Sequence, residues 1–180
     1  SRLYFLSRDG YQMYLVAKDI NRKMKLDIDI RYLNVSRYSM RVPEYALLGD
    51  KCLDRIFIGG IDVTFRRIMK RAALTDAEID SVAKECDAGK DPDRILNYQE
   101  VMSLKQKFIG NKKLMGFIRK HSEEAYPKAI GYLRQEGLLD DVNYALVDSG
   151  WVGTLQQTIR HLTQKERIDG FYFGLYEIPK

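Results

Sequence analysis

The stretch "LYFLSRDGYQMYLVAK", Leu3 to Lys18, joins a short apolar run to a helical pattern through four residues that are polar or glycine. The first part, Leu3 to Leu6, is typical of a buried strand, and Gly10 permits a tight turn after it. Beyond the turn, apolar side chains recur at the spacing of one helix face: Met13, Val16, Ala17, Ile20 and Met24.

A second strand is predicted over residues 28–35, where apolar residues alternate and then run together before Ser36-Arg37-Tyr38. Strand, helix and strand in this order predict the start of a parallel sheet with a right-handed crossover. The same pattern returns near the other end of the sequence. Residues 143–147 ("NYALV") are strand-like and lead into "DSGWVGT", a helix follows, and residues 170–176 ("GFYFGLY") form the last predicted strand.

The middle of the chain, residues 41–137, shows helical patterns and almost no strand pattern. Thr75 and Glu78 have the spacing of a capping box at a helix start, and Asp91-Pro92 suits the first positions of a later helix. We therefore expect an α/β fold: a Rossmann-like, three-layer core with a mostly parallel sheet, formed by residues 1–40 and 138–180. Residues 41–137 would be a large, cap-like helical insertion.

Composition limits the classes of function. The 180 residues are 45% apolar and 31% charged, with a formal net charge of +5. The basic excess is mild and lies in short runs of mixed sign, which indicates solvated faces and no nucleic-acid partner. No apolar run is long enough for a membrane span. Cys52 and Cys86 lie outside any motif and fit a reducing compartment, so a cytoplasmic location is expected.

Polar clusters follow three of the predicted strands: Ser7-Arg8-Asp9-Gly10, Ser36-Arg37 and Asp148-Ser149-Gly150. The carboxyl ends of parallel strands meet at one edge of a sheet, where ligands bind at the topological switch point. Each following helix directs free N–H groups and its positive dipole end to that edge. Arginine adds planar, bidentate donors. These residues therefore predict an anion site, most simply for phosphate, with Asp148 beside it to hold a divalent cation or a hydroxyl group.

Structural alternatives exist for the same residues. Ser7 or Asp9 would also suit a cap on the first helix. Arg8 and Arg37 would also suit surface ion pairs, and Trp151 would also suit packing.

Several segments resemble haloacid dehalogenase-like phosphohydrolases. "YFLSRDG" resembles that superfamily's second motif, a strand ending in Ser or Thr that holds the transferred phosphoryl group, which implies this role for Ser7. "YPKAIGYLRQEGLLDDVNYALVDSG" is similar to its later region, which implies Lys128 as the phosphate-stabilising lysine and Asp148 as the magnesium-binding acid. With Asp9, these two residues are the candidates for catalysis.

More narrowly, "LYFLSRDGYQMY", "YLNVSRYSMRVP" and "VDSGWVGTLQ" resemble a bacterial group of predicted hydrolases of this superfamily. Its members often neighbour or fuse to surface-polysaccharide glycosyltransferases. The resemblance implies a phosphorylated small molecule or nucleotide sugar as ligand, and an adjacent glycosyltransferase or hydrolase domain as partner.

The sequence departs from the superfamily at its nucleophile, which belongs to an Asp-x-Asp after a strand. Asp27-Ile28-Asp29 precedes a strand instead, and the acid expected four residues after Asp148 is Val152. We therefore expect either a nucleophile upstream of Ser1 or a degenerate unit that only binds.

A second resemblance is to type I phosphoribosyltransferases. "LYFLSRDGYQMYLVAKDI" resembles their first strand, pyrophosphate loop and helix, and "DIDIRYLNVSRYS" resembles their second strand with its Ser-x-Tyr, here Ser36 and Tyr38. "YALVDSGWVGTLQQTI" is similar to their diphosphate-sugar motif. This implies that Asp148 contacts a ribose hydroxyl and that Gly153 and Thr154 belong to a 5-phosphate loop.

This resemblance has departures too: Ser149 replaces the second acid, the loop is short with a single threonine, and the helical insertion is foreign to the family. Our principal hypothesis is a haloacid dehalogenase-like domain that binds a phosphorylated ligand or nucleotide sugar. It would act as a phosphatase-type hydrolase only when joined to an upstream segment. The alternatives are phosphoribosyl-type transfer and a non-catalytic ligand-binding or docking module.

Overall fold

The computed structural model describes residues 1–86, 90–150 and 152–176. The chain forms two compact units, one from residues 1–41 and 128–180 and the other from residues 42–127. We call them the sheet unit and the helical unit. Each is described by itself.

The sheet unit contains a four-stranded sheet in the order β2-β1-β3-β4, with all neighbours parallel. Its elements are β1 (Arg2–Leu6), α1 (Gly10–Met24), β2 (Asp29–Leu33), β3 (Tyr144–Asp148), α8 (Thr154–Thr163) and β4 (Asp169–Tyr172). This confirms the predicted α/β, Rossmann-like fold.

Two strands are shorter than predicted. β2 covers residues 29–33 of the predicted 28–35, and β4 covers 169–172 where 170–176 was expected. β4 ends because the register of its partner β3 ends, with Asp148 opposite Tyr172. Apolar residues beyond that point therefore lie outside the ladder, which a sequence pattern does not reveal.

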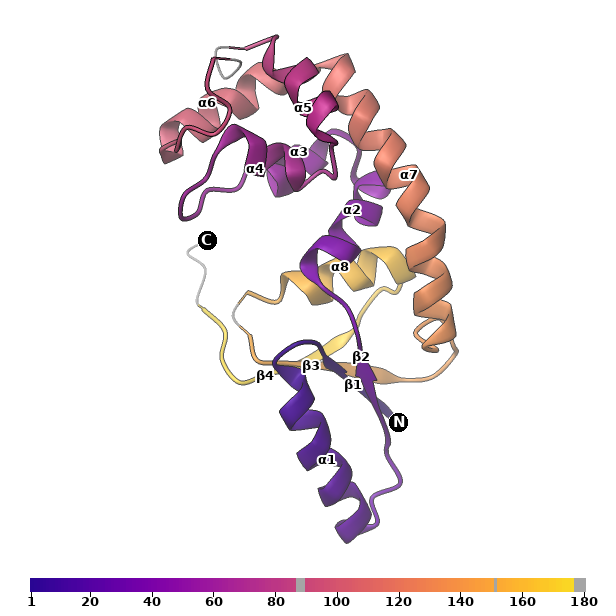
Figure 1. Ribbon diagram of the computed structural model, residues 1–180. Coiled ribbons are helices and arrows are strands. Elements are labelled where there is room, and N and C mark those ends of the chain that lie inside the picture. The colour runs from indigo at the N-terminus through magenta and orange to yellow at the C-terminus, as the bar shows by residue number, and fades with distance from the viewer. Residues whose placement is uncertain (87–89, 151, 177–180) are drawn as a thin grey trace. The chain divides into compact units, whose positions relative to one another are not determined.

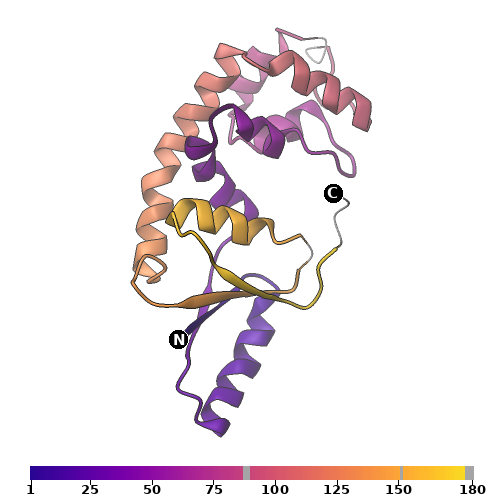
Figure 2. The same ribbon diagram turned by 180° about the vertical axis from the view of Figure 1, so that it is seen from behind.

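Helices lie on both faces of the sheet (Figures 1 and 2). On one face, Phe5 of β1 contacts Tyr14 of α1, with ring centroids 6.3 Å apart. On the other face, the Tyr4 hydroxyl donates to the Glu136 carbonyl at 2.5 Å, just beyond the end of α7 (Lys112–Gln135). Alternate side chains of β1 are thus buried in opposite directions, as expected for a parallel strand covered on both faces.

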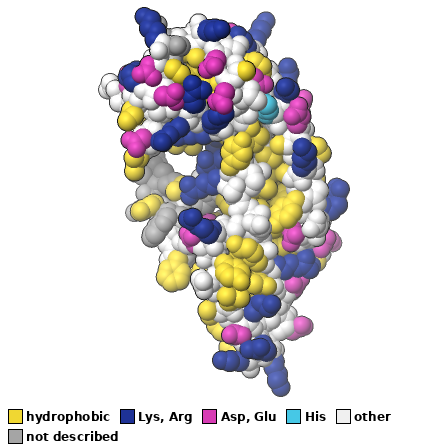
Figure 3. Space-filling model, viewed as in Figure 1, with side chains coloured by type: hydrophobic (Ala, Val, Ile, Leu, Met, Phe, Trp, Pro, Cys, Tyr) yellow, Lys and Arg dark blue, Asp and Glu magenta, His cyan; other side chains and the backbone are white. Residues whose placement is uncertain are grey.

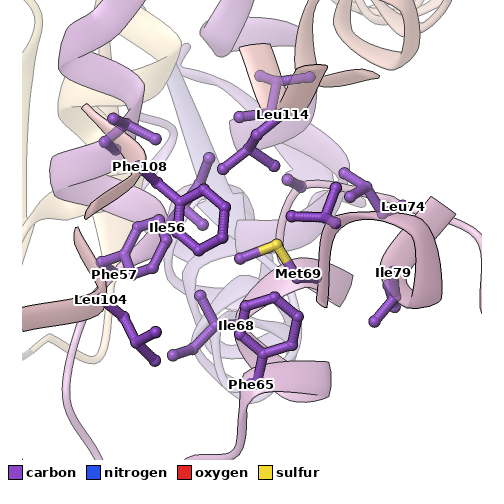
Figure 4. Packing of buried hydrophobic residues seen from close by; sticks show 14 of the residues in the cluster. Ile56, Phe57, Phe65, Ile68, Met69, Leu74, Ile79, Leu104, Phe108 and Leu114 are labelled. Carbon is purple, nitrogen blue, oxygen red and sulfur yellow. The ribbon is translucent and has the colours of Figure 1, made fainter. Parts of the chain in front are cut away.

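The helical unit contains η1 (Gly49–Lys51), α3 (Cys52–Ile56), α4 (Phe65–Lys70), α5 (Asp76–Ala83) and α6 (Tyr98–Phe108). Its core is a cluster of apolar side chains in which Phe108 packs against Phe57 and Phe65, each ring centroid 6.0 Å away (Figure 4). α2 (Arg37–Leu48) and α7 each contain residues of both units.

Helix starts in this unit follow the predicted capping chemistry in one case and not in another. The capping box of Thr75 and Glu78 is present at the start of α5, as predicted. The prediction that a helix begins at Asp91-Pro92 is wrong. The next helix, α6, starts at Tyr98, where Asn97 and Glu100 form a capping box. Two reciprocal side-chain to backbone hydrogen bonds satisfy more free N–H groups than a lone Asp before proline.

The C-terminal boundary of the helical unit differs from the expected one. We expected the insertion to end at residue 137, but residues from 128 onward belong to the sheet unit. The reason is that α7 runs unbroken through Pro127, and its last turns pack with the sheet: Leu133 is fully buried, and the Tyr132 hydroxyl accepts from the Asn34 N–H at 2.9 Å. No helix within the described residues is long and apolar enough to cross a membrane.

Candidate functional site

The three polar strand ends of the sheet unit line one cleft of about 710 Å³. The predicted site residues that line it are Ser7, Arg8, Asp9, Ser36, Arg37, Asp148, Ser149, Gly150, Gly153 and Thr154. They meet because β1 lies between β2 and β3 in a parallel sheet, so the carboxyl ends of all three strands face the same way.

Two predicted residues do not line the cleft. Gly10 is buried at the start of α1, and a Cβ there would lie 3.2 Å from the Phe5 carbonyl carbon. Its role is close packing of helix on strand. Lys128 is an exposed residue of α7, and the structure does not bring it to the strand ends.

The loop after β1 is tied to the end of β2 through Ser7. The Ser7 hydroxyl accepts from the Val35 N–H at 2.9 Å and donates to the Val35 carbonyl. The peptide between Ser7 and Arg8 is cis. Asp9 is the N-cap residue of α1, yet its side chain makes no capping hydrogen bond. The alternative in which Ser7 or Asp9 caps this helix is therefore wrong.

Asp9 instead faces other polar side chains. Its carboxylate lies 3.6 Å from the guanidinium of Arg8, whose side chain is 96% exposed. Its second oxygen accepts from the Ser149 hydroxyl at 3.2 Å. A salt bridge as exposed as that of Arg8 contributes little to stability, which leaves this arginine able to turn toward an anion.

The loop after β2 is closed by two serines. The Ser36 N–H donates to the Ser39 hydroxyl at 2.9 Å, and the Ser39 N–H donates to the Ser36 hydroxyl at 3.0 Å. This reciprocal pair acts as a capping box in which serine replaces the usual glutamate. Ser36 therefore starts α2, and Arg37 occupies the first helical position, exposed at the cleft.

Asp148, the last residue of β3, is partly buried at the cleft, and its Oδ1 accepts from the Ser149 N–H at 2.8 Å. Desolvation by burial raises the pKa of its carboxyl, and the negative charge of Asp9 adds to this. The N–H groups of Ser149 and Gly150 and the positive charge of Arg37 act in the opposite direction. The balance favours a raised pKa, so a cation or a hydroxyl donor would relieve the cost of keeping this carboxylate ionised.

The loop from β3 to α8 needs glycine. Gly150 has a φ of +125°, and a Cβ there would lie 2.0 Å from the Gly174 carbonyl oxygen. Gly153, with a φ of +66°, precedes the first turn of α8. The hydroxyl of Thr154, at the start of that turn, accepts from the Arg41 guanidinium at 3.4 Å. Trp151 lies outside the described residues.

The acidic residues at the cleft suit a metal ion that is shared with a bound phosphate better than a metal site built from protein side chains alone. Within the described parts of the chain, no group of three or more His, Cys, Asp or Glu side chains is placed to hold a metal ion. Asp9 and Asp148 supply two carboxylates at the cleft. Mg²⁺ is commonly bound by one or two carboxylates together with substrate phosphates and water, so these residues fit an ion that arrives with a phosphorylated ligand.

The Asp-x-Asp segment lies at the opposite edge of the sheet, as its position before a strand predicts. Asp29 pairs with Arg2 in the register of β1 and β2. Its carboxylate accepts from Arg2 at 2.7 Å and lies 2.9 Å from a guanidinium nitrogen of Arg31. These arginines hold the pKa of Asp29 below its ordinary value, and the carboxylate has a structural role there.

Sequence reasoning missed several residues at or beside the cleft: Tyr32, Asn34, Ser39, Arg41 and Leu155. Arg41 carries a detectable signal, because it follows Arg37 at the i, i+4 spacing of one helix face. Tyr32 and Asn34 carry none, because they lie within the strand pattern itself. No protein-family model matches the chain, and no curated protein matches it either.

Proposed function

We propose that the sheet unit binds a phosphorylated small molecule, a sugar phosphate or nucleotide sugar, in the cleft at the carboxyl ends of β1, β2 and β3. The observation that carries this proposal is the convergence of three polar strand ends on one cleft. The first residues of α2 and α8 also line it. Helix N-termini bring free N–H groups and positive dipole ends to a negatively charged ligand.

The phosphate is best accommodated at the start of α8. The N–H groups of the first turn of α8 have no partners within the helix, so they can donate to phosphate oxygens. Arg41 already contacts Thr154 at this end, and Arg37 lies one turn before it on α2. Both arginines can offer planar, bidentate donors to phosphate oxygens.

Asp148 would serve the part of the ligand next to the phosphate. Its carboxylate can accept from a sugar hydroxyl, or it can hold Mg²⁺ together with Asp9 and the phosphate oxygens. A bound Mg²⁺ would neutralise charge on the phosphate. In either case the raised pKa of Asp148 indicates a carboxylate that is poorly solvated without a ligand.

The strand order bears on the reaction class. β1 is paired on both sides, so a further strand can join the sheet only beside β2 or β4. Even beside β4, it would lie two strand spacings from β3, about 10 Å away. A nucleophile at its end is poorly placed to share one Mg²⁺ with Asp148, whose ligand distances are about 2 Å. The strand order therefore supports the hydrolase hypothesis less well than it supports phosphoribosyl-type transfer.

Phosphoribosyl-type transfer is therefore the second candidate function. It needs no aspartate nucleophile, because positioning and stabilisation of the leaving group's charge carry the chemistry. The residues that the resemblance assigns to it, Asp148, Gly153 and Thr154, line the same cleft. The non-catalytic module remains the alternative if ligand binds without turnover.

Isothermal titration calorimetry with ribose 5-phosphate and inorganic pyrophosphate, each with and without Mg²⁺, tests the proposal. We expect binding by the parent chain and a loss of about tenfold or more in Arg37→Gln, because a charged hydrogen bond is removed. The matched control is Arg134→Gln, an exposed arginine of α7 outside the cleft-lining set, which should bind as the parent does. Absence of binding by both probes would contradict the proposal.

A further inference from the structure

The cleft extends beyond the region that a phosphate would occupy. Its part over β2 is lined by Tyr32 and Asn34, and its charged side chains come from the loop after β1, from the end of β3 and from the start of α2. In the register, Tyr32 pairs with Phe5 of β1, and Phe5 pairs with Val147 of β3. Tyr32 therefore lies two strand spacings, about 10 Å, from the end of β3.

The ring of Tyr32 is held by other aromatic rings. Tyr11 contacts it edge to face, with centroids 5.4 Å apart and an interplanar angle of 77°. Tyr14 contacts it at 5.8 Å and also packs against Phe5 at 6.3 Å. A ring held by two neighbours, one of which packs in turn on Phe5, loses little conformational entropy when a ligand stacks on it.

The cluster is open to solvent on one side. Tyr11 is 47% exposed, and Figure 3 shows hydrophobic side chains gathered at the sheet end of α1, with lysine and arginine side chains toward its C-terminal end. Asn34 is exposed beside Tyr32, and among the described residues its side-chain amide has no hydrogen-bond partner. That amide offers both a donor and an acceptor.

We propose that this end of the cleft is a base-binding subsite, so that the ligand is a nucleotide whose phosphates lie at α8 and whose base stacks on Tyr32. This inference rests on the proposed function. The separation of the two ends is too long for a bare sugar phosphate to bridge and suits a nucleoside diphosphate. Every nucleobase has a π face for the ring, and the Asn34 amide would read the hydrogen-bonding edge of the base.

The test compares uridine 5′-diphosphate and adenosine 5′-diphosphate with ribose 5-phosphate by isothermal titration calorimetry. The parent should bind at least one nucleotide more tightly than the sugar phosphate. Tyr32→Leu should weaken nucleotide binding by about 5- to 150-fold, the range for loss of one stacked base, and should leave ribose 5-phosphate binding unchanged. Tyr32→Phe keeps the ring and is the matched control, with nearly parental affinity for all three probes.

A second variant guards against poor folding of Tyr32→Leu. This variant is Tyr11→Leu, at a position that is half exposed and is expected to tolerate leucine. Loss of the Tyr11 ring should loosen the Tyr32 ring and weaken nucleotide binding by a smaller factor than Tyr32→Leu does.

If ribose 5-phosphate binds while nucleotides bind no tighter, and neither leucine variant changes the affinity for nucleotides, the base subsite is refuted and the proposed function stands. Glucose 1-phosphate is titrated as a fourth probe: if it loses affinity in Tyr32→Leu as much as the nucleotides do, the ring receives a sugar and the assignment to a base is wrong. If no probe binds, both proposals fail.

Discussion

The Ser149 hydroxyl donates to the Asp9 carboxylate across 3.2 Å and so connects the loop after β3 to the loop after β1. The two residues are 140 positions apart in the chain. They meet because β1 and β3 are neighbours in a parallel sheet, which places their following loops side by side. Because Ser149 directly follows Asp148, the contact holds the Asp9 carboxylate close to the end of β3 that carries Asp148.

Ser149→Ala removes this contact. We expect the free energy of unfolding to change by less than about 1 kcal/mol, because the hydrogen bond is exposed. We also expect weaker binding of ribose 5-phosphate with Mg²⁺ in calorimetry, because Asp9 is no longer held toward the cleft. Ser149→Thr keeps a hydroxyl and should bind more nearly as the parent does. Equal affinity in the parent and the alanine variant would show that the connection has no part in binding.

Asp148→Asn separates a ligand-binding role from a structural one. Its Oδ1 can still accept from the Ser149 N–H, so we expect thermal stability to stay within about 1 kcal/mol of the parent. The variant should lose the stabilisation that ribose 5-phosphate or pyrophosphate with Mg²⁺ gives the parent by mass action. A variant that barely folds, beside a parent that no phosphorylated ligand stabilises, would make Asp148 a structural residue.

The same variant predicts a pH dependence. Burial raises the pKa of Asp148 in the folded chain above the ordinary value of 3.8, so ionisation of this carboxyl disfavours folding. As pH rises from below 3.8 through the folded pKa, the parent should lose stability relative to Asp148→Asn. Chemical denaturation across this range measures the difference, and a constant difference would contradict the prediction.

Gly150→Ala tests the packing of the loop after β3. A Cβ at this position would lie 2.0 Å from the Gly174 carbonyl oxygen, and the φ of +125° is unfavourable for alanine. We expect a loss of about 1–3 kcal/mol in unfolding free energy, with weaker binding of ribose 5-phosphate. Gly131→Ala, at an exposed position inside α7 where the added Cβ has no atom within 4 Å apart from the neighbouring residues and backbone of its own helix, is the control and should gain about 0.5–1 kcal/mol. A tolerant Gly150→Ala would show that the loop has room to move.

Glu78→Gln tests an electrostatic contact in the helical unit. Burial raises the pKa of Glu78, but hydrogen bonds from the Thr75 backbone and from His121 outweigh it and hold the pKa below its ordinary 4.5. The Glu78 and His121 side chains approach to 2.7 Å. Because the folded pKa is depressed, the stabilisation is complete above 4.5 and is lost as pH falls through the folded value.

We therefore expect Glu78→Gln to be less stable than the parent by about 1 kcal/mol at neutral pH, with the difference shrinking in acid. Urea denaturation at successive pH values measures it. If the difference in unfolding free energy between the parent and Glu78→Gln persists below the folded pKa, the stabilisation does not come from the charge of Glu78.

Hydrolysis of simple phosphate esters provides a further test. We expect the chain to show little or no magnesium-dependent turnover of p-nitrophenyl phosphate, because its Asp-x-Asp lies at the opposite edge of the sheet and Asp29 is paired with two arginines. Rapid turnover that disappears in Asp9→Asn would overturn this prediction and give Asp9 a catalytic role.

Local patterns in the sequence were enough to predict the strand–helix–strand start, the sheet-bearing ends of the chain, and the capping box at Thr75. The convergence of Ser7, Ser36 and Asp148 was predictable too. Parallel strands place their carboxyl ends at one edge whatever lies between them in the chain, so no knowledge of the insertion was needed.

The tertiary structure alone decided which side chains meet at that edge and which are used for structure. Ser7 is bonded to Val35, Ser36 is paired with Ser39, and Lys128 lies outside the cleft, while Tyr32 and Arg41 lie at or beside it. These outcomes depend on the register between strands and on the path of α7, which bring together residues far apart in sequence. Local periodicity reports how each segment buries its apolar face, and it carries no information about which distant segment supplies the partner.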